Sequence, residues 1–398
     1  MLRIAIRMLV GDVTKWVGVL LGVFLCTFLI THMLSLFSGM MERSYALVTD
    51  IPQAEIWVMD PAVQYADEPI GMPETALQRV RAVTGVEWAV PLHTGSLRVR
   101  LPSGAFQSVL IVGVDDATLV GAPDHIIDAK AEVLRSNDSV IVDRASAKTL
   151  LRLPIEPPSK DPGGYPKLDF RAPSRPLRVG DELLINDHRV VVAAFADLGT
   201  RFLNKPTAYT TYSRALAIAP RERNQLSFVL VKAAPGQDHA ALARKITADT
   251  GLRARTAAEF CDDTYCYYVE TTGVVKRVGL MVGIGVITGV SVSALLLYLF
   301  TNENLRYYAV LKALGAANRT ILAMVLVQAA IACATGYGLG IGISAIIGTV
   351  FVSDAMPYKL LFLTLWFSAG AVTFVGIVAA GLSAQRVFRL EPGVVFKA

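Results

Sequence analysis

The sequence predicts a membrane protein with four transmembrane helices and a large α+β domain inserted between the first helix and the second. Hydropathy points to the membrane, since 53% of the 398 residues are hydrophobic and the mean hydropathy is +0.48, above that of an average soluble domain. Four long stretches carry no Asp, Glu, Lys or Arg. A long segment of ordinary polarity separates the first stretch from the second and shows the patterns of short strands and helices.

The four charge-free stretches are residues 16–38, 278–302, 320–353 and 360–385. Each reaches the roughly 20 residues that an α-helix needs to cross about 30 Å of hydrocarbon. A charged residue at the centre of such a helix costs about 2.5 to 3.5 kcal/mol on insertion scales. In a chain that is 18% charged, stretches of this length therefore predict membrane spans.

The first span has a basic flank, like a secretion signal, because Arg3, Arg7 and Lys15 precede it. A cleaved signal has an apolar core of only about 7 to 15 residues and a small-residue cleavage site. The first stretch is longer, and residues 31–35 offer no such site. An uncleaved anchor is therefore favoured. Residues 2–15 alternate basic and apolar positions, which predicts a short amphipathic helix on the inner face of the membrane.

Lysine and arginine predict the orientation, since they concentrate in short loops on the cytoplasmic side. They occur beside the termini and between the second and third spans, whereas the loop between the third and fourth spans holds only Lys359. Both termini and residues 303–319 are therefore expected in the cytoplasm, with the inserted domain outside. Lys276 and Arg277 count against the rule, from which long translocated domains are largely exempt. The pI near 9.0 then reflects topology, and no nucleic-acid partner is needed.

The inserted domain, residues 46–272, mixes strand and helix patterns in an order that favours an α+β fold over a doubly wound sheet. Strands are expected at 55–59, 108–114, 139–142, 182–185, 189–194 and 228–231, and helices at 74–83 and 239–250. Residues 153–178 are rich in proline and should form an irregular surface loop. This loop is either a binding element or a passive insertion, and the passive alternative is favoured.

Two of the four cysteines, Cys26 and Cys333, fall inside spans and should pack as small apolar residues. Cys261 and Cys266 lie in the outer segment close to the second span. An oxidising compartment predicts a disulfide between them. A zinc site would need two further ligands that nothing nearby clearly supplies.

Small residues recur in the spans at intervals of four, a spacing that lets helices approach closely in lipid. The pairs are Gly279 with Gly283, Gly285 with Gly289, and Gly338 with Gly342. We expect these faces to meet other helices. His32 is the one readily titratable side chain inside a span; a hydrogen bond to a neighbouring helix is favoured over a haem or proton role.

The chain lacks the motifs of catalytic subunits. No G-x-x-x-x-G-K-[ST] phosphate loop occurs, no His/Glu metal pair stands at helical spacing, and no G-x-S-x-G nucleophile elbow is present. The glycine-rich residues 336–342 lie within an apolar span without a preceding strand, which favours helix packing over phosphate binding. We therefore expect no enzymatic activity, no cofactor and no metal in this chain.

The segment between the second and third spans is the most specific motif. Residues 302–316 read NENLRYYAVLKALGA, which resembles the signature that follows the second span of FtsX-like and MacB-like permeases. The pattern predicts a helix that continues out of the membrane and stops at Gly315, with Asn318 as a possible N-cap of the next helix. An ordinary helical hairpin is the alternative. Asn304 and Tyr307 depart from the family pattern, which usually has a basic and an acidic residue there.

The resemblance extends along nearly the whole chain. Residues 75–91 are similar to the family's helix, Gly-Val, strand and proline element, and residues 112–115 (VGVD) and 179–183 (VGDEL) to two of its turns. The tail at 386–392 resembles the basic-Leu-x-Pro ending of these permeases. The strand at 56–60 and the chain length are similar to those of DevC-type exporters.

The resemblance implies three segments: residues 1–45 with the amphipathic helix and first span, a MacB-like periplasmic core domain at 46–272, and an FtsX-like transmembrane domain at 273–398. It further implies that residues 303–319 couple the permease to a separate ATPase. The residues that match the coupling motif are Glu303, Arg306, Lys312, Leu314, Gly315 and Ala316.

The function implied is that of a permease subunit of an ABC export complex in the bacterial inner membrane, which acts on lipidic or amphipathic cargo. Its implied partners are two copies of an ATPase, which bind ATP and Mg, and a second permease copy, identical or related. A periplasmic membrane-fusion protein and an outer-membrane channel would extend the pathway. Two alternatives remain: an FtsX-type mechanical regulator of an outer partner such as a cell-wall hydrolase, and a sensor or anchoring module.

Overall fold

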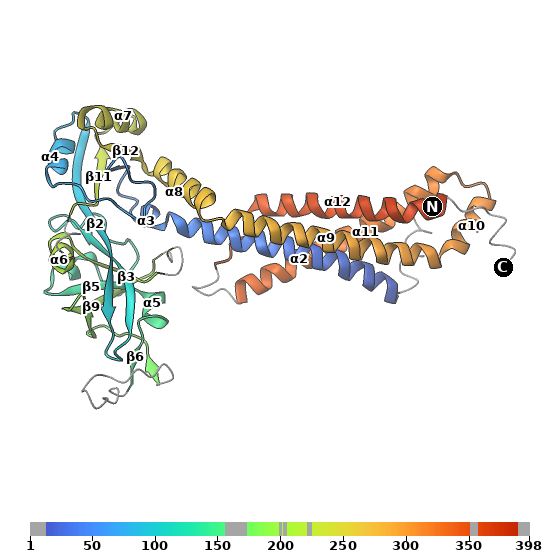
Figure 1. Ribbon diagram of the computed structural model, residues 1–398, viewed down its shortest axis with the longest axis horizontal. Coiled ribbons are helices and arrows are strands. Elements are labelled where there is room, and N and C mark those ends of the chain that lie inside the picture. Colours follow the sequence, from blue (N-terminus) through green and yellow to red (C-terminus); the bar gives the residue numbers. More distant parts are fainter. Residues whose placement is uncertain are drawn as a thin grey trace. The chain divides into compact units, whose positions relative to one another are not determined.

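The chain folds into two compact units (Figure 1). The computed structural model describes residues 13–155, 173–198, 201, 205–220, 225–350 and 357–388. Met1–Met40 and Gly273–Ala398 form what we term the membrane unit, and Met41–Thr272 form the inserted domain. Most of the amphipathic helix expected at 2–15, most of the proline-rich loop at 153–178 and most of the tail at 386–392 lie outside the described residues.

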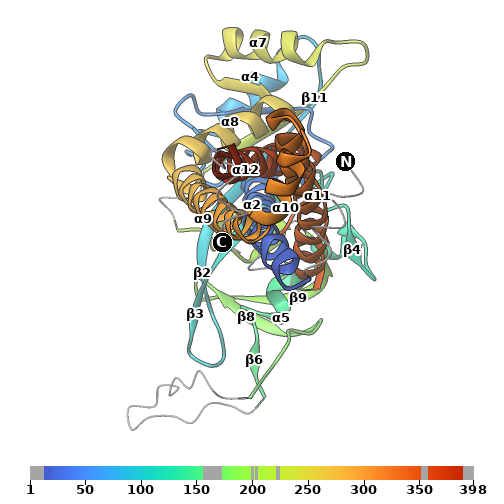
Figure 2. The same cartoon turned by 90° about the vertical axis from the view of Figure 1, so that its right-hand side faces the viewer.

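Four long apolar helices make up the membrane unit, and Figure 2 shows them gathered in a bundle. They are α2 (Val13–Ser44), α9 (Val274–Glu303), α11 (Asn318–Val350) and α12 (Phe362–Phe388). Each contains a segment of 24 residues or more that is long and apolar enough to cross a membrane. The prediction of four spans is therefore confirmed.

Glycines bring two of these helices close to α2. A Cβ atom on Gly289 of α9 would lie 2.3 Å from Cys26 Sγ, and one on Gly285 would lie 3.6 Å from Leu29. On α11 the close approaches come from Gly336 and Gly340, where a Cβ would lie 2.8 Å from Val23 and 2.6 Å from Thr27. Gly289, Gly336 and Gly340 are needed because any larger side chain would overlap α2, whereas at Gly285 a Cβ would make an ordinary contact.

Gly338 and Gly342, the pair of α11 expected to pack against another helix, meet no described helix of this chain, and their contact with another helix stays a prediction. A Cβ on Gly338 or Gly342 would meet no described atom within 4 Å, and the same holds for Gly279 and Gly283 on α9. Two residues correspond to about 200° around a helix. The Gly338 and Gly342 pair therefore points away from the face through which α11 packs on α2.

The inserted domain is built on one large mixed sheet, with the strand order β12-β1-β11-β2-β3-β10-β5-β9-β4 and with β8 beside β2 and β9. The α+β prediction is confirmed. The strands of this sheet are β1 (Ile56–Met59), β2 (Val86–Arg100), β3 (Phe106–Val114), β4 (Ile126–Ile127), β5 (Ser139–Asp143), β8 (Glu182–Ile185), β9 (His188–Ala196), β10 (Thr207–Thr211), β11 (Phe228–Ala233) and β12 (Arg253–Thr256). The short strands β6 (Leu153–Pro154) and β7 (Ser174–Arg175) pair separately.

Helices cover this sheet: α4 packs against β2 and α7 against β12, and the two helices touch each other (Figure 1). The helices of the domain are α3 (Ala46–Thr49), α4 (Thr75–Arg81), η1 (Ala131–Arg135), α5 (Arg144–Lys148), α6 (Tyr212–Ile218), α7 (His239–Thr250) and α8 (Ala257–Thr271). The start of α8 is fixed by a capping box, in which the Thr256 hydroxyl accepts from the Glu259 N–H and the Glu259 carboxylate accepts from the Thr256 N–H.

Aromatic packing attaches α8 to the sheet. Trp57 on β1 and Phe260 on α8 are both fully buried, and their ring centroids lie 5.8 Å apart. Phe228 on β11 packs edge-on against Trp57 at 5.4 Å. Burial of large aromatic side chains contributes strongly to stability, and edge-to-face pairs add about 0.5 to 1.5 kcal/mol each. The helix that leads from the domain to the second span is therefore anchored in the domain core.

The disulfide expected between Cys261 and Cys266 is not formed. Both residues lie on α8, and both thiols are free. Five residues along an α-helix separate two Cα atoms by about 8.6 Å and turn the side chains about 140° apart, whereas a disulfide requires Cα atoms within about 7 Å. Burial, with a smaller effect from the neighbouring Asp262 carboxylate, raises the pKa of the Cys261 thiol to about 11. This thiol is thus protonated and poorly reactive at neutral pH.

We predict that unfolded, unreduced protein carries free thiols at both positions. Alkylation without reductant followed by peptide mass spectrometry should find both cysteines of the α8 peptide modified. A parallel sample reduced before alkylation serves as the control and should give the same result. A peptide that resists alkylation until it is reduced would contradict the helical structure of α8.

Candidate functional site

The segment between the second and third spans contains a break and a separate helix. After α9 ends at Glu303, Asn304 departs from helical geometry with φ −89° and ψ 7°, and α10 then runs over Leu305–Ala313. The continuous helix expected from the sequence is therefore interrupted. Because Asn is only a moderate helix former and its side chain competes for backbone hydrogen bonds, a one-residue interruption at this position is physically reasonable.

A Schellman turn ends α10. The Ala316 N–H donates to the Leu311 carbonyl at 3.0 Å, and the Gly315 N–H donates to the Lys312 carbonyl at 3.1 Å. Gly315 has φ +91°, a conformation that residues with a Cβ atom rarely adopt. The predicted role of Gly315 as the residue after the helix cap is confirmed. Asn318 is the first residue of α11 and thus lies one position beyond its expected place as the N-cap.

The outer face of α10 carries large apolar side chains. Leu314 is 80% exposed, Tyr307 63% and Val310 39%. Their spacing of three and four residues places them along one side of the helix, and we call these three residues the exposed stripe. Apolar side chains that are gathered on a surface commonly mark a protein contact. The motif identified Leu314 but missed Tyr307 and Val310, although the helical spacing of the three apolar positions was available in the sequence.

The opposite face of α10 is clamped to the span that follows. Tyr308 is fully buried, and its hydroxyl donates to Gln328 Oε1 on α11 at 3.0 Å. Burial raises the pKa of Tyr308 to about 12, which keeps the hydroxyl protonated as a donor. Close by, the hydroxyls of Thr301 on α9 and Ser383 on α12 share a hydrogen bond, and Ser383 also donates to the Leu297 carbonyl. The segment is therefore held by the spans on its inner side.

The structure places the other motif residues on the surface of the same segment. Glu303 and Arg306 are exposed, while Lys312 and Ala316 are half-buried. Single ion pairs at such wet positions contribute only about 0 to 1 kcal/mol. The exposed stripe and the turn at Gly315 are therefore the stronger candidates for a binding surface than the charged residues.

The inserted domain contains a cavity of ≈ 1130 Å³. It lies where β2 changes partner: residues up to Leu92 pair with β11, and those from His93 pair with β3. The side chains around it are mostly polar, namely Tyr65, Asp67, Glu68, Thr94, Ser96, Gln107, Ser108, Lys205, Gln225, Ser227, Tyr268 and Thr272. The Thr94 hydroxyl is buried and has no hydrogen-bond partner among the described residues, so it is available to a polar ligand.

The charged groups of this cavity are perturbed by burial. Burial raises the pKa of the Asp67 carboxyl, opposed by the nearby Arg201 and by the Tyr268 hydroxyl, which donates to Asp67 at 3.0 Å. Burial also lowers the pKa of Lys205, whose ammonium donates to the Ser96 hydroxyl. Tyr65 stacks on Tyr267 with ring centroids 4.2 Å apart. The cavity thus combines an acid, a base and aromatic rings within one polar lining.

We predict that Tyr308→Phe loosens α10 without unfolding the spans. The variant keeps the ring but removes the hydrogen bond to Gln328, which is worth about 1 kcal/mol, so amide exchange over α10 should rise roughly fivefold. Hydrogen–deuterium exchange of the full chain in nanodiscs measures the effect. Tyr307→Phe is the matched control, because its side chain is exposed. Equal exchange in the two variants would show that the Tyr308 clamp does not hold α10.

Comparisons with known proteins cover both units. The family model described as the MacB-like periplasmic core domain matches residues 17–249, and the one described as the FtsX-like permease C-terminal region matches residues 279–392. No curated protein matches the chain.

Two solved structures are similar to it. One is the extracellular domain of the noncanonic ABC-type transporter YknZ from Gram-positive bacteria, at 13% identity, with 51% of this chain and 99% of that chain covered and a TM-score of 0.32. The other is the periplasmic region of MacB from Actinobacillus actinomycetemcomitans, at 11% identity, with 54% and 94% covered and a TM-score of 0.35.

The two family models together cover the first span, the inserted domain as far as residue 249 and the three spans that follow it, in the order in which the structure has them. Permeases of this type work with an ABC ATPase partner. The chain belongs to the family of MacB-like and FtsX-like ABC transporter permeases.

Proposed function

We propose that the chain is the permease subunit of an ATP-driven export complex and that its ATPase docks on residues 303–319. The observation that carries this proposal is the exposed stripe. Tyr307, Val310 and Leu314 stand out from a helix whose other side is buried against the spans. An ATPase that covers this stripe would remove its apolar surface from water, at roughly 25 cal/mol per Å².

ATP binding belongs to the partner in this proposal. The sequence contains no phosphate loop, so ATP and Mg would be held by two ATPase copies beneath a permease dimer, formed with an identical or a related copy. This chain would hydrolyse no ATP itself. The clustering of Lys and Arg next to the spans supports cytoplasmic termini and a cytoplasmic coupling segment, with the inserted domain in the periplasm of a bacterium.

The contacts of α10 and α9 support transmission of motion from the ATPase to the inserted domain. The stripe lies on α10, which is clamped to α11 through Tyr308 and Gln328. The end of α9 is clamped to α12 through Thr301 and Ser383. Because α8, just before α9 in the chain, is anchored in the domain core by Phe260, displacement of α10 would be passed through α9 towards the inserted domain.

The cavity of the inserted domain supports export over mechanical regulation. A permease that only moves an outer enzyme needs no cavity for a ligand, whereas ≈ 1130 Å³ is slightly more than the roughly 300 to 1,000 Å³ that is usual for small-molecule sites. Its polar lining suits the polar end of an amphipathic cargo. A membrane-fusion protein and an outer-membrane channel would then receive this cargo outside the inner membrane.

We predict that Leu314→Asp and Gly315→Val weaken ATPase binding by at least about tenfold. Aspartate places a charge in an apolar contact, and valine at φ +91° costs at least about 1 kcal/mol and distorts the turn that presents Leu314. Glu303→Ala and Arg306→Ala should have milder effects. Co-purification with the cognate ATPase and cargo-stimulated ATP hydrolysis in proteoliposomes are the measurements.

Two matched controls separate these effects from general damage. Asn302→Asp adds the same charge at another exposed position, and Ala323→Val adds the same branched side chain at an exposed helical position outside residues 303–319. Both should bind ATPase as wild type does. If Leu314→Asp and Gly315→Val also retained wild-type binding and hydrolysis, residues 303–319 would not be the coupling element.

A further inference from the structure

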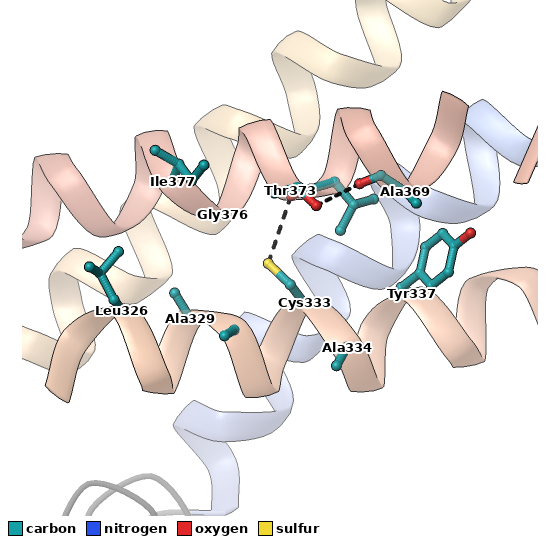
Figure 3. Close-up of a pocket in the computed structure, with 11 residues that line it drawn as sticks. Leu326, Ala329, Cys333, Ala334, Tyr337, Ala369, Thr373, Gly376 and Ile377 are labelled. Atoms are coloured by element: carbon teal, nitrogen blue, oxygen red, sulfur yellow. Dashed lines mark hydrogen bonds between the residues drawn. The ribbon is translucent and has the colours of Figure 1, made fainter. Parts of the chain in front are cut away.

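A narrow groove of ≈ 420 Å³ runs between α11 and α12 (Figure 3). Small residues leave the space open: Ala330 and Ala334 on α11, and Ala369 on α12. Figure 3 shows Leu326 and Ile377 at one end of the groove and Tyr337 at the other. We call this space the α11–α12 groove.

The groove presents no free polar group among its described lining residues. The Thr373 hydroxyl donates to the Ala369 carbonyl at 2.8 Å, and the Tyr337 hydroxyl donates to the Leu365 carbonyl at 2.7 Å. The Cys333 thiol contacts the Val372 carbonyl at 3.8 Å. Each polar hydrogen is thus directed to the backbone of α12. A polar ligand would lose its hydrogen bonds to water in this groove and gain none in return. Burying a polar group in this way costs several kcal/mol, roughly 2 to 7.

The length and volume of the α11–α12 groove fit an extended chain as its occupant and exclude a helix. From Leu326 to Tyr337 the groove follows eleven residues of α11, a length of about 17 Å at 1.5 Å per residue. This is about half of the roughly 30 Å hydrocarbon core, the depth of one leaflet. A helix is about 10 Å wide, so 17 Å of helix would need roughly 1300 Å³, about three times the volume of the groove. A single extended hydrocarbon chain matches both the length and the volume.

The position of the groove along α11 selects the leaflet. Leu326 lies eight residues after Asn318, the first residue of α11, so most of the groove's lining on α11 lies in the half of that helix next to the coupling segment, while its lining on α12 lies near the middle of that helix. Gln328, which holds Tyr308, belongs to the same turns of α11. Any molecule in the groove would therefore support α11 directly beside the clamp of α10.

We propose that the α11–α12 groove is a binding site for one acyl chain of a bilayer phospholipid, in the leaflet next to residues 303–319. The lipid fills the space that the small residues leave and braces α11 against α12 at the level of the Tyr308 clamp. This site is distinct from the polar cavity of the inserted domain, and its existence does not depend on the cargo or on the direction of transport.

The test is photolabelling of the full chain in nanodiscs of phosphatidylethanolamine and phosphatidylglycerol that contain a phospholipid with a diazirine in its acyl chain. Peptide mass spectrometry should find adducts on residues 326–337 and 369–377 at least fivefold more often than on the exposed α11 surface around Ala323. Lipid labels spread evenly over all lipid-facing residues would overturn the proposal, because they would indicate only a general lipid shell.

Filling the groove should remove the label. Ala330→Leu combined with Ala334→Leu adds apolar volume inside the groove and keeps good helix formers in α11, so labelling should fall at least fivefold. Ala323→Leu is the matched control, since Ala323 is exposed on the same helix and outside the groove lining, and it should leave labelling unchanged. Undiminished labelling of the filled variant would contradict the site. So would Cys333 cross-linking to a second copy of the chain, which would assign the groove to a protein contact.

Discussion

Hydrocarbon accepts a polypeptide backbone only if every N–H and C=O group finds its partner within the protein, and the architecture of this chain depends on that constraint. It enforces four uninterrupted helices across the membrane and confines irregular backbone to their ends. Between the second and third spans the chain must reverse direction, and the hydrogen bonds of the last turn of α10 are completed by the Schellman turn at Gly315. The same turn exposes Leu314. The element that we assign to ATPase binding is thus a direct consequence of how the chain turns back towards the membrane.

Small residues allow the four membrane-spanning helices to pack closely against one another. In lipid, helices gain little from apolar contact alone, so close approach of their backbones supplies the packing energy. Gly289, Gly336 and Gly340 allow this approach to α2. Where small residues on neighbouring helices do not interdigitate, as at Ala330 and Ala369, they leave an empty space instead. The α11–α12 groove and the tight contacts with α2 therefore arise from the same composition.

Much of the fold could be predicted from the sequence, because its signals are local. Charge-free length identified the four spans, and short apolar runs bounded by turn residues identified β8 and β11. The strand β2 was recognised only in part, since Pro91 and Gly95 interrupt its pattern and only pairing with β11 and β3 extends it to Arg100. Helix α8 was missed because its run of polar and aromatic residues has a weak apolar period, and its anchor, Phe260, gains meaning only from contact with Trp57.

At the candidate site, too, the sequence predicts what local geometry determines and misses what depends on contacts between distant residues. The motif pointed to Leu314 and Gly315, whose geometry follows from the local turn, but it did not reveal which side of α10 faces outward. That information comes from the burial of Tyr308 against Gln328, a contact across twenty residues. For the same reason the glycine pairs were assigned by spacing alone, which did not identify Gly336 and Gly340 as the residues of α11 that meet α2. The disulfide was inferred from compartment and sequence distance, without the helix that separates the two thiols.

The central claim is that the exposed stripe of α10 is covered by an ATPase subunit, and site-specific photo-crosslinking tests it most directly. A short photoreactive amino acid placed at position 314, in the full chain expressed with its ATPase in intact membranes, should give an ATPase adduct that is identified by mass spectrometry. Position 338 is the comparison, because Gly338 faces no described atom of this chain from within a span, and it should give no such adduct. An ATPase adduct from position 314 alone is the result that the account predicts. Adducts from position 314 with lipid or with unrelated proteins, and none with the ATPase, would contradict it.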